Sequence, residues 1–213
     1  MNTLPKGHKK LLHAWAFYDW ANSVYSLVIS SAIFPIFYGA LTIVKDEDGS
    51  ILDDTVDFFG ISFNNDSLIS YVTATAFLVV SILSPFLSGI ADYVGNKKNF
   101  LKFFCYLGAF SCIGLFWFSL EFLWFGLLCY FLALIGFWAS LVFYNSYLPD
   151  IAFPNQQDKV SAKGFSLGYI GSVILLVVCL LMILNYETFG FESEALPTRL
   201  SFVLTGVWWI GFS

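Results

Sequence analysis

Long apolar stretches constrain this chain more than any other feature of its sequence. A helix that crosses a bilayer needs about 20 consecutive apolar residues, because the hydrocarbon core is about 30 Å thick. Backbone polar groups in lipid must also be hydrogen-bonded within the protein, which favours helices. The sequence therefore predicts an all-α membrane protein. Its predicted complete spans are 14–44, 68–91, 100–120, 122–148 and 160–184, followed by an apolar run at 200–213 that is too short to cross.

Composition leads to the same prediction independently. Hydrophobic residues make up 58% of the chain and charged residues only 12%, whereas about 25% charged residues is usual in a soluble domain. A water-soluble fold could not bury so much apolar surface. We therefore expect the lipid bilayer to be a partner, and we expect no nucleic-acid partner because the ten basic residues lie mostly at membrane edges.

The lysines gather on one side of the predicted membrane. Eight of the nine precede the first span or lie between the second and third or the fourth and fifth spans. Positive residues in short loops tend to stay in the cytoplasm, which predicts that residues 1–13 are cytoplasmic. The loop at 45–67 is acidic and is predicted to lie outside. Asp48-Gly49 and Asn64-Asn65 are turn signals that allow a short hairpin in this loop.

The loop between the second and third spans carries two glycines, one acid and two lysines. These residues are Gly89, Asp92, Gly95, Lys97 and Lys98. Glycine permits tight turns and close helix approach, and positive-inside lysines are common in such a turn. The pattern Gly-x-x-Ala-Asp-x-x-Gly-x-Lys-Lys resembles the loop between the second and third helices of the major facilitator superfamily. That resemblance implies a gating latch that pairs with the other half of a transporter.

The first span contains a polar set with helical spacing. Asp19, Asn22, Ser23, Ser26 and Ser30 recur at intervals of three and four, and we expect them on one helical face. An ionisable residue inside a span is costly unless it meets water, a partner or a cavity. Asp19, Asn22 and Ser26 are therefore predicted to lie on a substrate or ion pathway, where Asp19 could bind a coupling proton. The alternative places Asp19 at the inner membrane interface.

The fourth span carries a second polar group. Tyr144 and Asn145 could hydrogen-bond a solute on the same pathway, or could bond neighbouring helices, which is worth on the order of 1 kcal/mol in membranes. Asp150 follows at the cytoplasmic end, where Lys97 or Lys98 should also emerge. Either a gating ion pair or a solvated acid at the helix end is expected there.

The fifth span has a face of small residues, Gly164, Gly168 and Gly171. Small residues let membrane helices approach closely, so helix packing is the predicted role of these three glycines. The alternative is that the same face moves against another helix during transport.

Three ordered blocks carry a narrower resemblance. They are Phe17–Ser23, Phe143–Asp150 and Ser161–Gly171. They resemble signature segments of the autophagy-related vacuolar effluxer branch of the major facilitators and its bacterial relatives. The resemblance implies the amino-terminal six-helix bundle of that fold, with the sixth helix incomplete and the carboxy-terminal bundle missing. It favours a bacterial inner membrane and, from the yeast members, amino acids as solutes.

Other chemistries find little support. The chain has no Gly-x-x-x-x-Gly-Lys-Ser/Thr phosphate loop and no Gly-x-Ser-x-Gly nucleophile elbow. Its four cysteines have no metal-ligand spacing. We expect no enzyme activity, no cofactor and no metal. The leading hypothesis is half of a secondary active transporter that moves a small solute by alternating access; the alternative is a small oligomeric membrane scaffold or channel.

Overall fold

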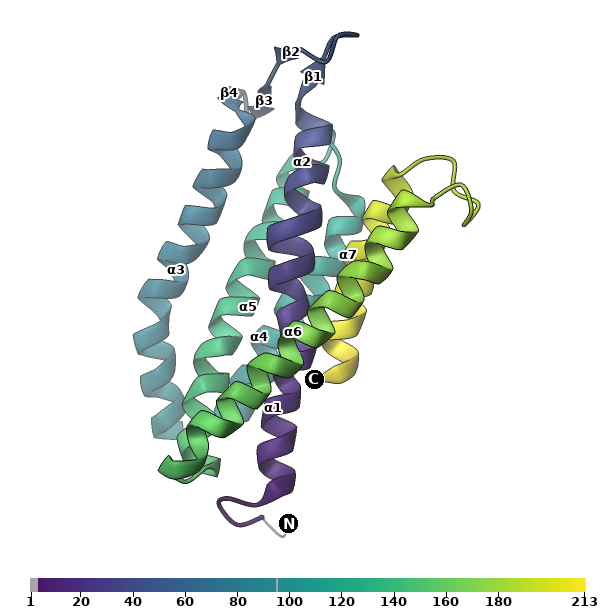
Figure 1. The fold of residues 1–213 in the computed structure, drawn as a ribbon. Coiled ribbons are helices and arrows are strands. Elements are labelled where there is room, and N and C mark those ends of the chain that lie inside the picture. Colours follow the sequence, from purple (N-terminus) through teal and green to yellow (C-terminus); the bar gives the residue numbers. More distant parts are fainter. Residues whose placement is uncertain (1–3, 95) are drawn as a thin grey trace.

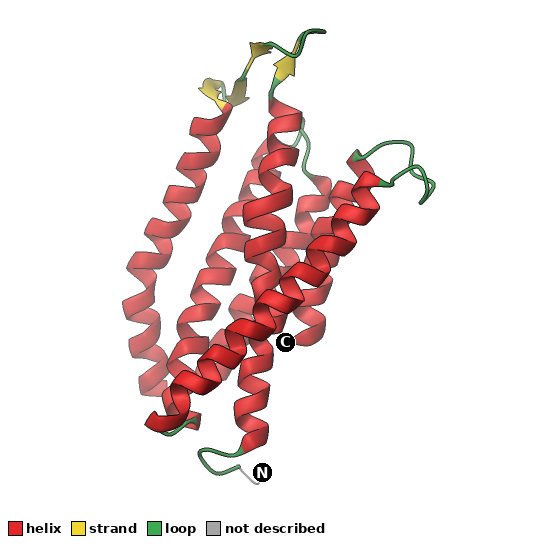
Figure 2. Ribbon diagram, viewed as in Figure 1, coloured by secondary structure: helices red, strands yellow, loops and turns green. Residues whose placement is uncertain are grey.

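The structure is a computed structural model that describes residues 4–94 and 96–213. Long helices run side by side between two ends (Figures 1 and 2), one carrying the amino terminus and the other carrying short strands. Among these described residues, five helical segments are long and apolar enough to cross a membrane, which confirms the all-α membrane fold. The helices are α1 (Lys9–Val24), η1 (Tyr25–Ile33), α2 (Phe34–Thr42), α3 (Asn65–Val94), α4 (Lys97–Gly114), η2 (Leu115–Trp117), α5 (Leu123–Ile151), α6 (Pro154–Leu184) and α7 (Ala195–Phe212).

Most helices extend beyond the apolar stretches that predicted them. The first begins at Lys9 instead of residue 14, where the His8 Nδ1 atom accepts a hydrogen bond of 3.2 Å from the Lys10 amide. The fifth span begins at Pro154 instead of residue 160, because proline is well suited to the first turn of a helix. Hydropathy marks the part of a helix that lies in lipid, and the polar ends continue the same helix.

The acidic loop folds into two antiparallel hairpins instead of one. Strands β1 (Val44–Lys45) and β2 (Ile51–Asp53) form the first, and β3 (Thr55–Phe58) and β4 (Ile61–Asn64) form the second. The second turn is Phe59-Gly60, where both residues have positive φ. Asn64 is therefore not in a turn. Its side-chain oxygen accepts a hydrogen bond of 3.1 Å from the Asp66 amide at the start of α3.

The first span is one continuous helix from Lys9 to Thr42, but its middle part is a π-helix. Pro35 follows this π segment and lacks an amide hydrogen, and a proline ring clashes with the carbonyl group four residues earlier in an α-helix. That carbonyl belongs to Ser31, whose hydroxyl donates to the Ser26 carbonyl at 2.9 Å, five residues back. The wider turn changes which side chains share a face after Ser26.

The two most extensive helix contacts in the bundle are α4 with α5 and α1 with α6. At the first pair, a Cβ on Gly136 would lie 2.5 Å from the Gly108 Cα atom. Helix α3 stands apart from the other helices (Figure 1) and packs chiefly against α5. The α1–α6 pair surrounds Asp19 and is described next.

Candidate functional site

Asp19 is buried where α1 meets α6. Its side chain is 5% exposed, and its Oδ1 atom accepts a hydrogen bond of 2.7 Å from the Ser23 hydroxyl. A Cβ on Gly168 would lie 3.2 Å from the Asp19 Cγ atom, and one on Gly164 would lie 3.5 Å from Oδ2. The glycines thus let the α6 backbone approach the carboxyl group directly.

No basic side chain pairs with Asp19 in the described part of the chain. Lys163 on α6 instead lies 3.2 Å from the His13 ring on α1, towards the amino-terminal end of the bundle. Ser23 is the hydrogen-bond partner of the carboxyl group. A buried acid with one hydroxyl partner is suited to binding a proton or a cation, because no fixed positive charge neutralises it.

A recess of about 250 Å³ opens beside Asp19 on the side towards the strands. Its polar lining comes from α1, η1 and α6, and its apolar walls come from η1, α5 and α6. Among the lining residues, Ser172 is 2% exposed and its hydroxyl has no hydrogen-bond partner among the described residues. The lining residues are Asp19, Ser23, Ser26, Leu27, Ser31, Phe137, Leu141, Phe165, Gly168, Tyr169 and Ser172.

An aromatic pair closes the other side of Asp19. The Trp15 and Tyr144 rings stack with centroids 4.1 Å apart and an interplanar angle of 7°. The Trp15 indole N–H donates to the Tyr144 carbonyl at 2.8 Å, which fixes the tryptophan against α5. A Cβ on Gly164 would lie 2.9 Å from the Tyr144 hydroxyl. Helix α6 therefore packs directly over this stack.

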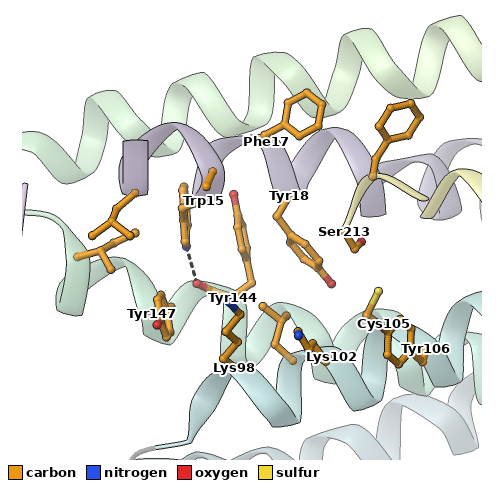
Figure 3. A pocket seen from close by; sticks show the side chains of 15 residues that line it. Trp15, Phe17, Tyr18, Lys98, Lys102, Cys105, Tyr106, Tyr144, Tyr147 and Ser213 are labelled. Carbon is orange, nitrogen blue, oxygen red and sulfur yellow. Dashed lines mark hydrogen bonds between the residues drawn. The ribbon is translucent and has the colours of Figure 1, made fainter. Parts of the chain in front are cut away.

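A second cavity, of about 430 Å³, lies beyond the stack. Figure 3 shows Trp15 and Tyr18 on α1 facing Lys98 and Lys102 on α4. The Tyr144 ring lies between Trp15 and Tyr18 (Figure 3). The Trp15–Tyr144 stack thus borders this cavity, and Asp19 lines the recess described above.

The predicted pathway residues do not all meet. Asp19 and Ser26 line the recess, and Tyr144 packs beside Asp19. Asn22 is fully buried, and it is not among the lining residues of the recess. Asn145 is exposed on α5 and lies outside the recess. Asn22 and Asn145 therefore do not line the recess with Asp19 and Ser26.

Some of the predicted gating residues lie outside the part of the chain that the structure describes. Gly95 and the side chain of Asp92 are not among the described parts of the structure. Gly89 lies within α3 instead of in a turn, and a Cβ there would meet nothing within 4 Å. Lys97 on α4 pairs with Asp150 on α5 at 2.9 Å. Lys98 lines the second cavity.

Sequence reasoning missed two serines of the recess as site residues. Ser31 takes the place expected for Ser30 because the π segment places residues five apart on one face. Pro35 was the signal in the sequence, since it disrupts the preceding α-helical hydrogen bonds. Ser172 belongs to the small-residue face of α6, whose predicted role was helix packing. Two glycines of that face, Gly164 and Gly168, lie next to Asp19.

Comparisons with known proteins agree on one family. The model of the family described as vacuole effluxer Atg22 like matches residues 7–213. An uncharacterized MFS-type transporter, YxiO, of Bacillus subtilis is 35% identical over 96% of this chain and 45% of its own length. Autophagy-related protein 22 of Coccidioides immitis is 24% identical over 96% of this chain and 47% of its own length. No solved structure gives a significant match. The chain spans about half the length of these curated relatives.

Proposed function

This chain belongs to the vacuole effluxer Atg22-like family, and from that membership we propose that it forms the amino-terminal half of a secondary active transporter. The transporter moves a small solute by alternating access, with the solute path between this bundle and a second one. The names of the relatives, the five membrane-spanning helices and the matched half-length support this proposal. We further propose a bacterial inner membrane, with the amino terminus in the cytoplasm.

Asp19 is the observation that carries the proposal. An acid at the centre of a transmembrane helix costs at least about 2.5 kcal/mol on insertion scales. This one is buried, accepts a hydrogen bond from Ser23 and has no basic partner among the described residues. Binding a proton would remove the charge. Asp19 is therefore the proposed coupling site, and the recess beside it is this bundle's share of the solute path.

Amino acids are the solutes to test first. The recess of about 250 Å³ has a carboxyl group and hydroxyl groups on one side and aromatic rings on the other. Such a surface suits a small solute that carries both polar and apolar groups. The Lys97–Asp150 pair is proposed to form part of a gating latch at the end of the bundle that carries the amino terminus (Figure 1). Asp92, Gly95 and Lys98 are proposed to belong to the same latch.

Transport by the protein that the complete gene encodes tests the coupling site. Membrane vesicles carrying Asp19→Asn should lose uptake or efflux of radiolabelled amino acids driven by an imposed pH gradient, while the protein still reaches the membrane. Asp158→Asn is the matched control, because Asp158 is an exposed acid near the start of α6. Wild-type gradient-driven transport by Asp19→Asn would remove Asp19 from the mechanism.

Sequencing the gene past the codon for Ser213 tests the proposed architecture. A reading frame that continues through six further spans would support a two-bundle transporter. A stop codon there, combined with a homo-oligomer in native membranes, would overturn it in favour of a scaffold or channel.

A further inference from the structure

The two sides of Asp19 differ in chemistry. Towards the strands lies the recess with its hydroxyl groups, and towards the amino terminus lies the stack of Trp15 on Tyr144. We propose that, in the conformation described here, Asp19 exchanges its proton with the end of the bundle that carries the hairpins, through a hydroxyl track formed by Ser23, Ser26, Ser31 and Ser172. Alternating access then opens Asp19 to the other end in a different conformation. This inference rests on the proposed function of Asp19 as a coupling site.

The π segment builds one side of the hydroxyl track. Ser23 donates to Asp19, and Ser26 lies further along the same helix towards the hairpins. In an α-helix the next serine on this face would be Ser30, four residues later. The π geometry instead brings Ser31 into the recess, with its hydroxyl 2.9 Å from the Ser26 carbonyl. Hydroxyl groups therefore follow one another along the recess, where they can hydrogen-bond water and pass protons.

Ser172 supplies the other side of the track. Helical serines commonly hydrogen-bond to a carbonyl group in the preceding turn, and in this chain Ser84, Ser111 and Ser166 each bond to the carbonyl four residues earlier at 2.7–2.9 Å. Ser172 makes no such bond, although it is buried. The hydroxyl groups of Tyr18, Tyr25 and Tyr144 are likewise buried without a partner among the described residues, but of these four only Ser172 lines the recess. A buried hydroxyl without a partner calls for a ligand or a water molecule. Its place in the lining of the recess makes water or a transported proton the natural partner.

The aromatic stack closes the opposite route. The two rings lie almost parallel at 4.1 Å, and the indole N–H is already bonded to the α5 backbone. Helix α6 crosses directly above, with Gly164 close to the Tyr144 hydroxyl. The charged groups nearest along α1 and α6 on this side, His13 and Lys163, contact each other. The stack therefore lies between Asp19 and the second cavity, and the recess is the cavity that Asp19 itself lines in this conformation.

Side-specific thiol labelling of the complete protein tests this route without a known solute. Ser26→Cys is treated with a charged, membrane-impermeant methanethiosulfonate in right-side-out and inverted vesicles. Ser50→Cys, in the exposed turn between β1 and β2, reports which side of the membrane carries the hairpins. Ser30→Cys is the matched control, because Ser30 belongs to the same π segment but does not line the recess. The parent protein measures labelling of the four buried cysteines.

We expect Ser26→Cys to be labelled severalfold faster from the side that labels Ser50→Cys than from the other side. Ser30→Cys should be slow from both sides. Adding Trp15→Ala to Ser26→Cys should raise labelling from the opposite side, whereas Tyr144→Phe, which keeps both rings, should not. If the Trp15→Ala variant fails to accumulate, the comparison of Ser26→Cys with Ser30→Cys still tests whether the route runs through the recess.

Several results would overturn the route. They are equal labelling of Ser26→Cys from both sides, faster labelling from the amino-terminal side, no labelling from either side, and Ser30→Cys as reactive as Ser26→Cys. The outcome is separate from that for the coupling site. If Asp19→Asn abolishes gradient-driven transport but Ser26→Cys is not labelled from the hairpin side, Asp19 remains the coupling site and only the hydroxyl track is wrong.

Discussion

The α4–α5 and α1–α6 contacts are both built on glycine, yet they bury different chemistry. Between α4 and α5 two backbones meet, with a Cβ on Gly136 placed 2.5 Å from the Gly108 Cα atom. Between α1 and α6 a backbone also meets a carboxyl group, with Gly168 next to Asp19, while Gly171 lies against the Trp20 carbonyl. A glycine face therefore indicates close approach, and only the opposing residues show whether that approach serves packing or a polar site.

The largest effect should come from Gly136→Ala at the α4–α5 contact. The added methyl group would meet backbone atoms of Gly108, which cannot rotate away, and overpacking of this kind typically costs about 1–3 kcal/mol. We expect a clear drop in the midpoint of thermal unfolding in detergent. Gly211→Ala is the control, since a Cβ there meets nothing within 4 Å. Equal midpoints for the two variants would show that the α4–α5 contact is not rigid.

Gly168→Ala should change function more than stability. Its methyl group would lie 2.6 Å from the Ser23 hydroxyl, which is the end of a side chain that can rotate, so the helices can stay in place. The cost is loss of the Ser23–Asp19 hydrogen bond. We expect near-normal folding and reduced gradient-driven transport, measured as for Asp19→Asn. A variant that is less stable than Gly136→Ala would contradict this distinction between the two contacts.

Removing a buried serine hydroxyl should lower stability at Ser140 but not at Ser172. Ser140 on α5 is fully buried and donates to the Phe137 carbonyl at 2.8 Å, so Ser140→Ala should destabilise by about 1 kcal/mol. Ser172 is buried without a partner, so Ser172→Ala should leave the unfolding midpoint unchanged or raise it. Thermal unfolding measures both. A drop for Ser172→Ala as large as that for Ser140→Ala would mean that the Ser172 hydroxyl is satisfied within the protein.

Much of the fold follows from apolar length, because a span must match the thickness of the bilayer whatever its neighbours are. Asp19 could be singled out for a similar reason, since a charge within a span is costly in any fold. The residues around Asp19 were harder to predict from the sequence. Spacing of 3.6 residues places Ser30 on the face of Asp19, but the π segment before Pro35 places Ser31 there instead.

Tertiary contacts explain the other differences. Asn22 has helical spacing relative to Asp19, yet it points into the bundle, where spacing alone cannot say which face the neighbouring helices cover. The second hairpin was missed because its turn uses Phe59 with positive φ, a conformation that is uncommon for a bulky residue. The glycine contact between Gly108 and Gly136 joins different helices, and no periodicity within one helix reveals such a pair.

The Lys97–Asp150 pair lies at the end of the α4–α5 contact and should have the smallest effect on stability. Asp150 is about half exposed and the Lys97 side chain is 14% exposed, and exposed ion pairs typically contribute about 0–1 kcal/mol. Asp150→Asn should therefore barely change the unfolding midpoint. If the pair belongs to a latch, the same variant should change the sidedness of Ser26→Cys labelling, and exchanging the charges with Lys97→Asp and Asp150→Lys should restore it. Unchanged labelling in Asp150→Asn would remove the Lys97–Asp150 pair from the latch and leave it as a contact between α4 and α5.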